Sequence, residues 1–145
     1  MVVSDVLKHK GRQVFSVVPT DTALTALKKL SEHKIGAVIV RDKWGKLVGI
    51  FSERDVVNAI AKQGPEVVRL EVSHLMTSPV VTCHPDERVD AALAAMTRRK
   101  IRHLPVVDNG EIIGIVSIGD LVSHRLDEKE LEAAVLLEIS RMRAE

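Results

Sequence analysis

Apolar positions follow the same order twice along the chain. In the first half, an apolar run at 14–18 leads to Pro19, and apolar residues then recur every three or four positions, which predicts a helix. Two further apolar runs flank a turn at Gly45 and predict a β-hairpin. A helix from Asp55 to about Lys62 ends this half. The predicted order is therefore strand, helix, strand, strand, helix.

The second half repeats this order. Val80-Val81-Thr82 predicts the strand, the helix follows Pro85-Asp86, and Asn109-Gly110 marks the hairpin turn. The last helix is predicted from Asp120 to about Arg125. The inward-facing residues of the two longer helices share a helical spacing: Ala23, Ala26, Leu27 and Leu30 in the first half, and Val89, Ala92, Leu93 and Met96 in the second.

The two halves are copies of one unit. Pro19 and Pro85 are 66 residues apart, and Gly49 and Gly114 are 65 residues apart, which indicates an internal repeat. Because one copy is too small to bury its own sheet, we expect an α/β (α+β) sandwich of two β-α-β-β-α units related by a pseudo-twofold axis, with two equivalent clefts between them. The predicted boundaries are a first repeat at 2–62, a linker at 63–71, a second repeat at 72–125 and a C-terminal amphipathic helix at 126–145.

Short segments precede each repeat. Val3–Leu7 predicts a helical turn with Ser4 as its cap, and Val72–Met76 has a similar sequence before the second repeat. For the first long helix, Thr20 or Asp21 is the predicted cap.

The tail has no counterpart in the first repeat. Asp127 and Glu128 are typical of a helix start, and an apolar stripe follows that consists of Leu131, Val135, Ile139 and Met142. Its apolar arc, widened by Ala134, Leu136 and Leu137, is broader than packing on one neighbour requires. We therefore expect this helix to contact both its own unit and a partner chain.

Composition excludes several classes of protein. The chain has 145 residues, 46% of them apolar, and a net charge of +1, which gives no general attraction to polyanions or membranes. Phe15, Phe51 and Trp44 are its only aromatic residues, too few for a protein that stacks the bases of single-stranded nucleic acids. The lone Cys83 cannot form an internal disulfide, and no signal-like or membrane-length apolar segment occurs. These features favour a cytoplasmic protein.

A Ser-x-x-Asp motif ends each hairpin. Gly49-Ile50-Phe51-Ser52-Glu53-Arg54-Asp55 in the first repeat corresponds to Gly114-Ile115-Val116-Ser117-Ile118-Gly119-Asp120 in the second. At a helix start this spacing is common for capping alone. It also places a hydroxyl, which can donate to phosphate, beside a carboxylate that can accept two hydrogen bonds from the vicinal hydroxyls of ribose.

These residues closely resemble the cystathionine-β-synthase (CBS) domain family, as a stand-alone tandem pair. The resemblance covers about residues 2–125 and is most specific at 101–108 and 114–120. It implies an α/β sandwich module with a regulatory rather than catalytic role, which associates into flat homodimers. The implied ligands contain adenosine: AMP as first candidate, and ADP, ATP, NAD(H) or S-adenosylmethionine. No metal and no catalytic cofactor are expected.

The resemblance also implies which residues bind the ligand. Asp55 and Asp120 match the ribose-binding aspartates of the family, and Ser52 and Ser117 match the hydroxyls near the phosphates. The family builds each site from both repeats. One implied cleft combines Ser52, Arg54 and Asp55 with Ser73, Pro79, Val80, Ile101, Arg102 and His103, and the other combines Ser117 and Asp120 with Ser4, Val14, Ile35, Gly36 and Ala37.

The two repeats differ at positions that affect phosphate binding. Arg102 and His103 of the second repeat correspond to Gly36 and Ala37 of the first, so cationic partners are expected on one side only. Arg54 can also pair with a phosphate. We therefore predict unequal sites, with the Ser52/Asp55 cleft better suited to a phosphorylated ligand.

Other chemistry-bearing residues have simpler interpretations. Arg98-Arg99-Lys100 ends a helix, where cations interact favourably with the dipole. Cys83-His84 lacks the partners that a catalytic thiol or a metal site needs, and no glycine-rich phosphate-binding loop of the major nucleotide-using enzymes occurs. Trp44 suits either packing or a partner contact.

Three functions follow from these features. The first is a sensor in which an adenosine ligand changes the geometry of a dimer or of a separate effector protein. The second is a structural dimerisation module with vestigial clefts. The third, an enzyme that hydrolyses nucleotide slowly through Cys83 or a histidine, has the least support from the sequence.

Overall fold

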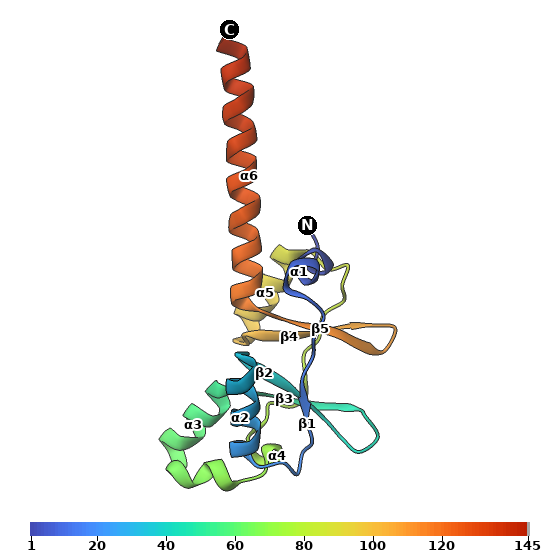
Figure 1. Cartoon of the computed structure of the whole chain (residues 1–145), viewed down its shortest axis with the longest axis vertical. Helices are drawn as coiled ribbons and strands as arrows, with labels where there is room; N and C mark the ends of the chain where they lie inside the picture. Colours follow the sequence, from blue (N-terminus) through green and yellow to red (C-terminus); the bar gives the residue numbers. More distant parts are fainter. Residues whose placement is uncertain (145) are drawn as a thin grey trace. The chain divides into compact units, whose positions relative to one another are not determined.

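The computed structural model describes residues Met1–Ala144, which form two compact units (Figure 1). The first-repeat unit comprises residues 13–81. The second-repeat unit combines residues 1–12 with the chain from Thr82 onward. The N-terminal segment therefore belongs to the unit built mainly from the second repeat, although it precedes the first repeat in the sequence.

A three-stranded sheet forms the centre of the first-repeat unit. Strand β2 lies between its neighbours, parallel to β1 and antiparallel to β3, with Ala37 opposite Ser52. The elements in chain order are β1 (Ser16–Val17), α2 (Ala23–His33), β2 (Ala37–Arg41), β3 (Leu47–Ser52), α3 (Glu53–Gln63), the 3-10 helix η1 (Pro65–Arg69) and α4 (Val72–Leu75). This order agrees with the predicted strand, helix, strand, strand, helix.

Aliphatic side chains fill the core of this unit. The predicted inward positions Ala23, Ala26 and Leu30 of α2 are buried, and Leu27 packs against the same cluster. Burying a leucine side chain such as that of Leu30 stabilises a fold by about 1.5–3 kcal/mol. The other buried members are Val17, Val38, Val40, Phe51, Val56 and Val72.

The second-repeat unit contains a two-stranded hairpin and three helices. Its elements are α1 (Val3–Lys10), α5 (Val89–Arg99), β4 (His103–Asp108), β5 (Glu111–Ser117) and α6 (Ile118–Ala144). The predicted strand at Val80-Val81-Thr82 does not form, and that prediction was wrong. A single parallel bridge between Cys83 and Val106 takes the place of a strand beside β4.

The hairpin turns have the backbone that their residues favour. Asn109 and Gly110 have φ of 51° and 79°, the positive values that a two-residue turn between antiparallel strands requires. Gly45 has φ of 79°, and Oδ1 of Asp42 accepts hydrogen bonds from the backbone N–H groups of Trp44 and Lys46 at 2.9 Å. Both turns lie where the sequence predicted them.

Helices α1 and α4 pack on the strand that ends in a Ser-x-x-Asp motif in their own unit. A Cβ atom added to Gly114 of β5 would lie 2.7 Å from Leu7 Cδ2, and one added to Gly49 of β3 would lie 2.4 Å from Met76 Sδ. Real Cβ atoms do not approach neighbours this closely. Each glycine therefore lets the segment that precedes a repeat lie directly against a strand.

The helix starts differ from those predicted. Val2, not Ser4, precedes α1, and its backbone N–H donates to Asp5 Oδ2 at 2.9 Å. Thr22, rather than Thr20 or Asp21, caps α2 by accepting from the N–H of Thr25 at 3.2 Å. In both cases the cap lies one or two residues from the predicted position, within the usual variation of helix ends.

Helix α6 is continuous from Ile118 to Ala144, whereas the sequence predicted a second helix starting near Asp127. No proline interrupts this segment, and Gly119 in its first turn is the only glycine. Asp127 and Glu128 therefore lie inside a helix that propagates through them. Glu145, the end of the predicted tail, lies outside the described residues. No helix among the described residues has both the length and the apolar content to span a bilayer.

Candidate functional site

Ser52 and Asp55 meet at the junction of β3 and α3. Oδ2 of Asp55 accepts hydrogen bonds from the backbone N–H of Ser52 at 2.9 Å and from Ser52 Oγ at 3.2 Å. Oδ1 accepts from Thr77 Oγ1 at 3.1 Å. Thr77 is fixed by two backbone hydrogen bonds with Ile50 of β3, at 2.8 and 3.1 Å. Both carboxylate oxygens are therefore positioned by neutral donors.

Burial controls the ionisation of Asp55. Removal from water raises the pKa of this carboxyl above its ordinary value, and the hydrogen bonds from Ser52 and Thr77 offset that rise only in part. No charged group contributes to the balance. Further hydrogen-bond donors would therefore stabilise the charged form of Asp55.

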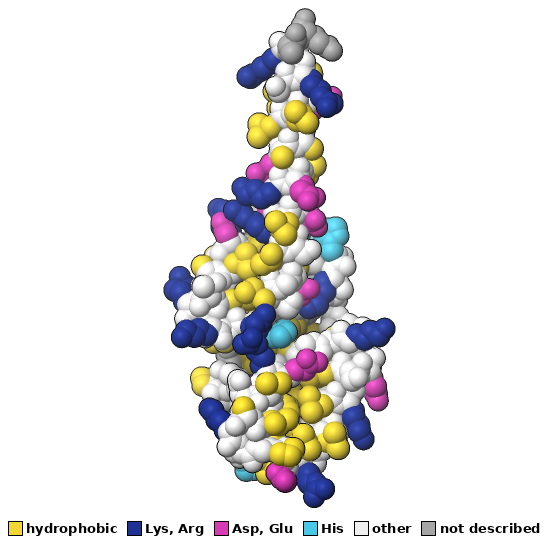
Figure 2. Space-filling view, turned by 90° about the vertical axis from the view of Figure 1, so that its left-hand side faces the viewer, with side chains coloured by type: hydrophobic (Ala, Val, Ile, Leu, Met, Phe, Trp, Pro, Cys, Tyr) yellow, Lys and Arg dark blue, Asp and Glu magenta, His cyan; other side chains and the backbone are white. Residues whose placement is uncertain are grey.

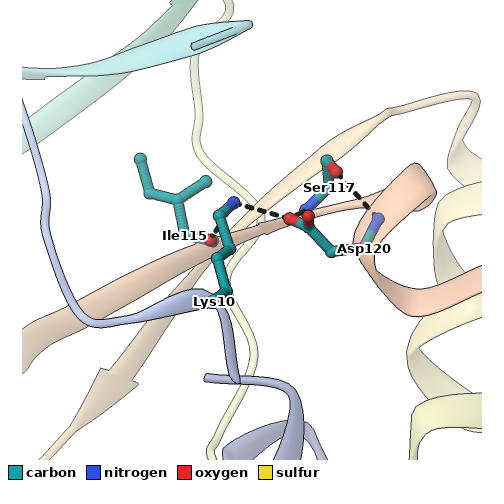
Figure 3. Close-up of polar contacts among 4 residues, drawn as sticks. All are labelled: Lys10, Ile115, Ser117 and Asp120. Atoms are coloured by element: carbon teal, nitrogen blue, oxygen red, sulfur yellow. Dashed lines mark hydrogen bonds and ion pairs between the residues drawn. The ribbon is translucent and has the colours of Figure 1, made fainter. Parts of the chain in front are cut away.

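Ser117 and Asp120 form the corresponding junction between β5 and α6 (Figure 3). Oδ2 of Asp120 accepts from the N–H of Ser117 at 2.8 Å, and the N–H of Asp120 donates to Ser117 Oγ at 3.0 Å. Lys10, at the end of α1, contacts the same Oδ2 at 2.5 Å and donates to the carbonyl of Ile115 at 2.7 Å. This junction therefore includes a cation that the first one lacks.

Lys10 changes the ionisation of Asp120. Burial by itself would raise the pKa of Asp120, but the hydrogen bonds from Lys10 and Ser117 and the charge of Lys10 outweigh it, so the pKa lies below its ordinary value. The side chains of Lys10 and Asp120 are 35% and 27% exposed, so solvent weakens this ion pair.

Both aspartates act as helix caps, which is the role that the Ser-x-x-Asp spacing predicts without any ligand. Each accepts the backbone N–H of the serine three residues before it. Asp5 and Asp21 make the same contact with Val2 and Val18 outside any Ser-x-x-Asp motif. A carboxylate has about four lone-pair positions, so a cap occupies only part of its capacity. In its own unit Oδ1 of Asp120 has no hydrogen-bond partner among the described residues.

The hairpins bring further predicted site residues beside each motif. Ala37 pairs with Ser52 across the first sheet, and His103 pairs with Ser117 across the second. The carbonyl of Arg102 accepts from the N–H of Ile118 at 2.8 Å, next to the motif. Burial, followed by the charges of Lys10 and Arg102, lowers the pKa of His103 and favours its neutral imidazole.

The predicted site residues divide between the two units. The first-repeat unit contains Ser52, Arg54, Asp55, Ser73, Pro79 and Val80, as well as Val14, Ile35, Gly36 and Ala37. The second-repeat unit contains Ser117, Asp120, Ser4, Ile101, Arg102 and His103. Each predicted cleft therefore draws residues from both units.

Individual side chains near the motifs differ in how they are held. Arg54 is exposed on the first turn of α3 and has no ion pair within the described part of its unit. Ser73 Oγ donates to Glu71 at 3.3 Å, and its backbone N–H donates to the carbonyl of Pro19 at 3.1 Å. Ser4 is half-buried in α1, and its N–H donates to the carbonyl of Pro85 at 2.9 Å.

Sequence reasoning missed Thr77 and Lys10. Lys10 supplies a cation at Asp120 that the prediction of one-sided cations did not count. The apolar residues Val3, Val6 and Leu7 predict that α1 is buried on one face, but the pattern does not identify what covers it. Had α1 been assigned to the second repeat, its basic last turn of Lys8, His9 and Lys10 would have pointed to this contact.

Cys83 and His84 have structural positions. Cys83 is 5% exposed, and burial together with the charge of Glu87 raises the pKa of its thiol to about 12. A thiol of this kind is not a nucleophile near neutral pH. His84 lies 3.6 Å from Asp86 and 3.5 Å from Asp108, and its Nδ1 accepts from the N–H of Asp86 at 3.1 Å.

Comparison with known sequences finds the same repeat. The CBS domain family matches residues 3–62 and 72–127. The mitochondrial CBS domain-containing protein CBSX3 of Arabidopsis thaliana is 34% identical over 92% of this chain and 71% of its own length. The CBS domain-containing protein YhcV of Bacillus subtilis is 30% identical over 92% of this chain and 94% of its own length. An uncharacterised protein of Methanopyrus kandleri is 37% identical, and the chain spans 57% of its length.

Solved structures have the same architecture. The CBS-domain protein ATU1752 of Agrobacterium tumefaciens has a TM-score of 0.82 at 44% identity, over 86% of this chain and 92% of its own. The CBS domain pair of MJ0100, in complex with 5′-methylthioadenosine and S-adenosyl-L-methionine, has a TM-score of 0.75 at 30% identity, over 89% and 98%. PAE2072 of Pyrobaculum aerophilum, complexed with AMP, has a TM-score of 0.76 at 28% identity, over 92% and 99%. From the duplicated unit, the family match to both copies and these relatives, the chain belongs to the CBS domain family and carries two CBS domains.

Proposed function

We propose that this protein is a regulatory module that binds an adenosine-containing ligand through Asp55 and Asp120. The observation that carries the proposal is that each repeat fixes a carboxylate at the same helix start, by a hydrogen bond from the backbone N–H three residues earlier. Relatives with this architecture are complexed with AMP or with 5′-methylthioadenosine and S-adenosylmethionine, which share the adenosine group. AMP is the first candidate, and ADP, ATP, NAD(H) and S-adenosylmethionine are the others.

The ribose is the part of these ligands that the carboxylates suit. Vicinal hydroxyls can donate to the two oxygens of one carboxylate, and a carboxylate already held by its cap loses little freedom when it accepts them. At Asp55 the hydroxyls would join or replace the donor Thr77. At Asp120 they would compete with Lys10, which would then be able to pair with a phosphate.

The remaining site residues are assigned roles by their chemistry. Arg54 and Arg102 are exposed cations beside the two motifs and suit a phosphate. Ser52 and Ser117 supply hydroxyls. The apolar and backbone groups proposed to hold adenine are those of Val14, Ile35, Gly36, Ala37, Pro79, Val80, Ile101 and His103, with Ser4 and Ser73 at the start of the preceding helices.

Regulation, rather than catalysis, fits this set of groups. The buried thiol of Cys83 is protonated near neutral pH, which argues against the nucleotide-hydrolysing alternative. A ligand that contacts both units would transmit its binding through their arrangement, either within a homodimer or to a separate effector protein. The ligand must then bind one arrangement more tightly than another, because equal affinities shift nothing.

Thermal unfolding with a panel of adenosine compounds tests the proposal. A ligand at about 100 times its dissociation constant should stabilise the fold by about 2.7 kcal/mol. Native mass spectrometry of the purified protein would identify a ligand that co-purifies. Asp55→Asn and Asp120→Asn should each weaken binding at least tenfold.

Matched controls separate binding from capping. Asp21→Asn in the first-repeat unit and Asp5→Asn in the second alter the same contact, from a carboxylate to the backbone N–H three residues earlier, outside the motifs, and should leave affinity unchanged. Full affinity in both Asp55→Asn and Asp120→Asn would contradict the ribose assignment. No stabilisation by any adenosine compound would instead favour a structural dimerisation module with vestigial clefts.

A further inference from the structure

The C-terminal part of α6, residues 126–144, is called the α6 tail; its first residues lie beside α1, and the rest extends beyond the other elements of its unit (Figure 1). Its large apolar side chains are between 42% and 70% exposed. Figure 2 shows hydrophobic side chains along this helix, interspersed with charged ones. They are Leu126, Leu131, Val135, Leu136, Leu137, Ile139 and Met142.

A helix with this surface needs a partner. In proteins, most of the stability of a helix comes from packing of its apolar face. The apolar side chains of the tail lie close together along one helix, and such an exposed patch marks an interaction site. The described elements of its own unit leave this surface uncovered.

One face of the tail carries a continuous stripe. Leu131, Val135, Ile139 and Met142 follow each other at intervals of three or four residues and so lie on one side of α6. Leu121, about five turns before Ile139, is on the same side and is fully buried within its own unit. The face that α6 packs against its own unit therefore continues into the exposed tail.

Charge is distributed unevenly along the tail. Its first part, residues 127–132, carries four acidic side chains and one lysine, whereas residues 138–143 carry two arginines and one glutamate. Arg141 lies 3.9 Å from Glu138, and both side chains are 70% exposed, so this ion pair is weak and leaves the arginine accessible. The tail is therefore acidic near its unit and basic near its end.

We propose that the α6 tail pairs with the α6 tail of a second copy of this chain, in antiparallel orientation. A parallel pair would set acidic segment against acidic segment, which is unfavourable, whereas an antiparallel pair sets each acidic segment against a basic one. A register that places Leu131 opposite Met142 brings residues 130–132 of each tail to the height of residues 141–143 of the other, so an acidic segment lies beside a basic one. Val135 and Ile139 lie between Leu131 and Met142 on the same face, so the apolar stripes of the two tails overlap along the pair.

The tail pairing is independent of the proposed ligand binding. It rests on the exposure, spacing and charge of the tail, and no residue of either Ser-x-x-Asp motif takes part. Its failure would therefore leave the adenosine proposal intact. Failure of the adenosine proposal would likewise leave the tail pairing intact.

Disulfide trapping in the full-length chain tests orientation directly. Leu131→Cys and Met142→Cys are made in separate chains, mixed and oxidised mildly with glutathione disulfide. Cys83 can stay in place because it is buried and its thiol has a pKa of about 12. The proposal predicts that the mixture yields a cross-linked dimer at least five times faster than either variant alone. Ala133→Cys, on the opposite side of the helix, is the matched control and should cross-link slowly with both.

Charge reversal gives a second measurement. Glu130→Arg with Glu132→Arg should weaken dimerisation at least tenfold in sedimentation equilibrium, as should Arg141→Glu with Arg143→Glu. Combining all four changes in one chain should restore dimerisation to within threefold of the parent. Reversal of two exposed lysines in the first-repeat unit, Lys28→Glu with Lys62→Glu, controls for a general effect of charge.

Three outcomes would overturn the proposal. Cross-linking of each single-cysteine variant with itself, at the rate of the mixture, would show a parallel pair. Mixed cross-linking no faster than that of Ala133→Cys would show that the tails do not pair, and the stripe would then belong to a different protein or a lipid surface. Truncation after Leu126 that leaves the dimer dissociation constant unchanged would show that another surface holds the copies together.

Discussion

Asp55 and Asp120 occupy the same position in the repeat, yet their pKa values move in opposite directions. Both are partly buried, which raises a carboxyl pKa. Asp120 has Lys10 beside it, so its charged form is favoured, whereas Asp55 has only neutral donors. The folded state therefore binds the proton of Asp55 more tightly than the unfolded chain does, and that of Asp120 less tightly.

The ion pair between Lys10 and Asp120 predicts a pH-dependent coupling. A carboxyl with a lowered pKa stabilises the fold above its ordinary value of 3.8, and this contribution is lost as pH falls through the folded-state pKa. A double-mutant cycle of Lys10→Met and Asp120→Asn should give a coupling free energy of about 0.5–1 kcal/mol at pH 7, measured by urea unfolding. The coupling should decline below about pH 4. A coupling that stays constant down to pH 3 would show that charge is not its source.

The contribution of Asp55 to stability depends on pH in the opposite direction. Because burial raises its pKa, this carboxyl favours folding most below its ordinary value, and its contribution decreases as pH rises through the raised folded-state pKa. Comparing the parent with Asp55→Asn by urea unfolding should therefore show the parent losing relative stability as pH rises from 3 to 7. A relative gain over that range would contradict the effect of burial.

Cys83 is predicted to be unreactive while the protein is folded. Its thiol is buried in a β-bridge with Val106, and its pKa is raised to about 12. Reaction with a disulfide reagent at pH 8 should be at least 100 times slower in the folded protein than in 8 M urea, as followed by absorbance. Equal rates would show that the segment around Cys83 opens readily.

At the scale of residues, the sequence predicted what is local. A Ser-x-x-Asp spacing determines a cap by itself, because the carboxylate and the N–H it accepts are three residues apart. The contacts that give each aspartate its distinct ionisation come from Thr77, 22 residues away, and from Lys10, 110 residues away. No local pattern encodes such contacts, and both were missed.

At the scale of elements, each unit borrows a segment that precedes the other repeat in the sequence. Helix α1 packs on β5 and α6, and α4 packs on β3. Leu7 and Met76 make these contacts over Gly114 and Gly49. Since the same small residue faces the same kind of side chain in both units, the packing follows the repeat.

Alanine at these glycines should therefore destabilise the fold. Gly114→Ala should lower the free energy of unfolding by about 1–3 kcal/mol, because the branched side chain of Leu7 is 1% exposed and cannot move aside. Gly49→Ala should cost less, since Met76 is half-buried and its thioether is flexible.

Gly119→Ala provides the control for that measurement. Its added Cβ would be 3.6 Å from Ser117 Oγ, an ordinary contact, and it lies in the first turn of α6. This change should leave stability unchanged or raise it by up to about 1 kcal/mol. Urea unfolding of the three variants measures how their free energies of unfolding rank. If Gly119→Ala lost as much stability as Gly114→Ala, the packing argument would be refuted.

The order of helices and strands could be predicted from the sequence, but some of their boundaries could not. Helix and strand periodicities gave α2, α5 and both hairpins with their turns. The strand predicted at 80–82 failed, because only Cys83 reaches a partner strand and formation of a strand depends on that partner. The break predicted in α6 failed because Asp127-Glu128 is as compatible with a helix interior as with a helix start.

At the scale of the whole molecule, the proposed ligand would connect two units by binding in the predicted clefts. Every predicted cleft combines residues of both, so a bound nucleotide would couple their positions. Such a ligand changes the arrangement only to the extent that it binds one arrangement more tightly. A shift from 1:99 to 99:1 would require about 10⁴-fold difference in affinity. A regulatory module can work with a much smaller difference if its partner also favours one arrangement.

Energy transfer between dyes can measure this coupling. Lys28 on α2 and Arg98 on α5 are exposed and belong to different units, so dyes on Lys28→Cys and Arg98→Cys report on the arrangement of the units. Saturating AMP, or whichever adenosine compound stabilises the fold, should change the transfer efficiency of this pair. Dyes on Lys28→Cys and Lys62→Cys, both in the first-repeat unit, should show no change.

The same measurement distinguishes binding from signalling. Adding Asp55→Asn or Asp120→Asn to the inter-unit pair should shift the response to at least tenfold higher ligand concentration, because the aspartate acts through affinity. If ligand binds, as thermal unfolding reports, but neither dye pair responds, the two units keep one arrangement in both states. Regulation would then have to act through local changes at the Ser-x-x-Asp motifs, since a ligand with equal affinity for two arrangements transmits nothing through them.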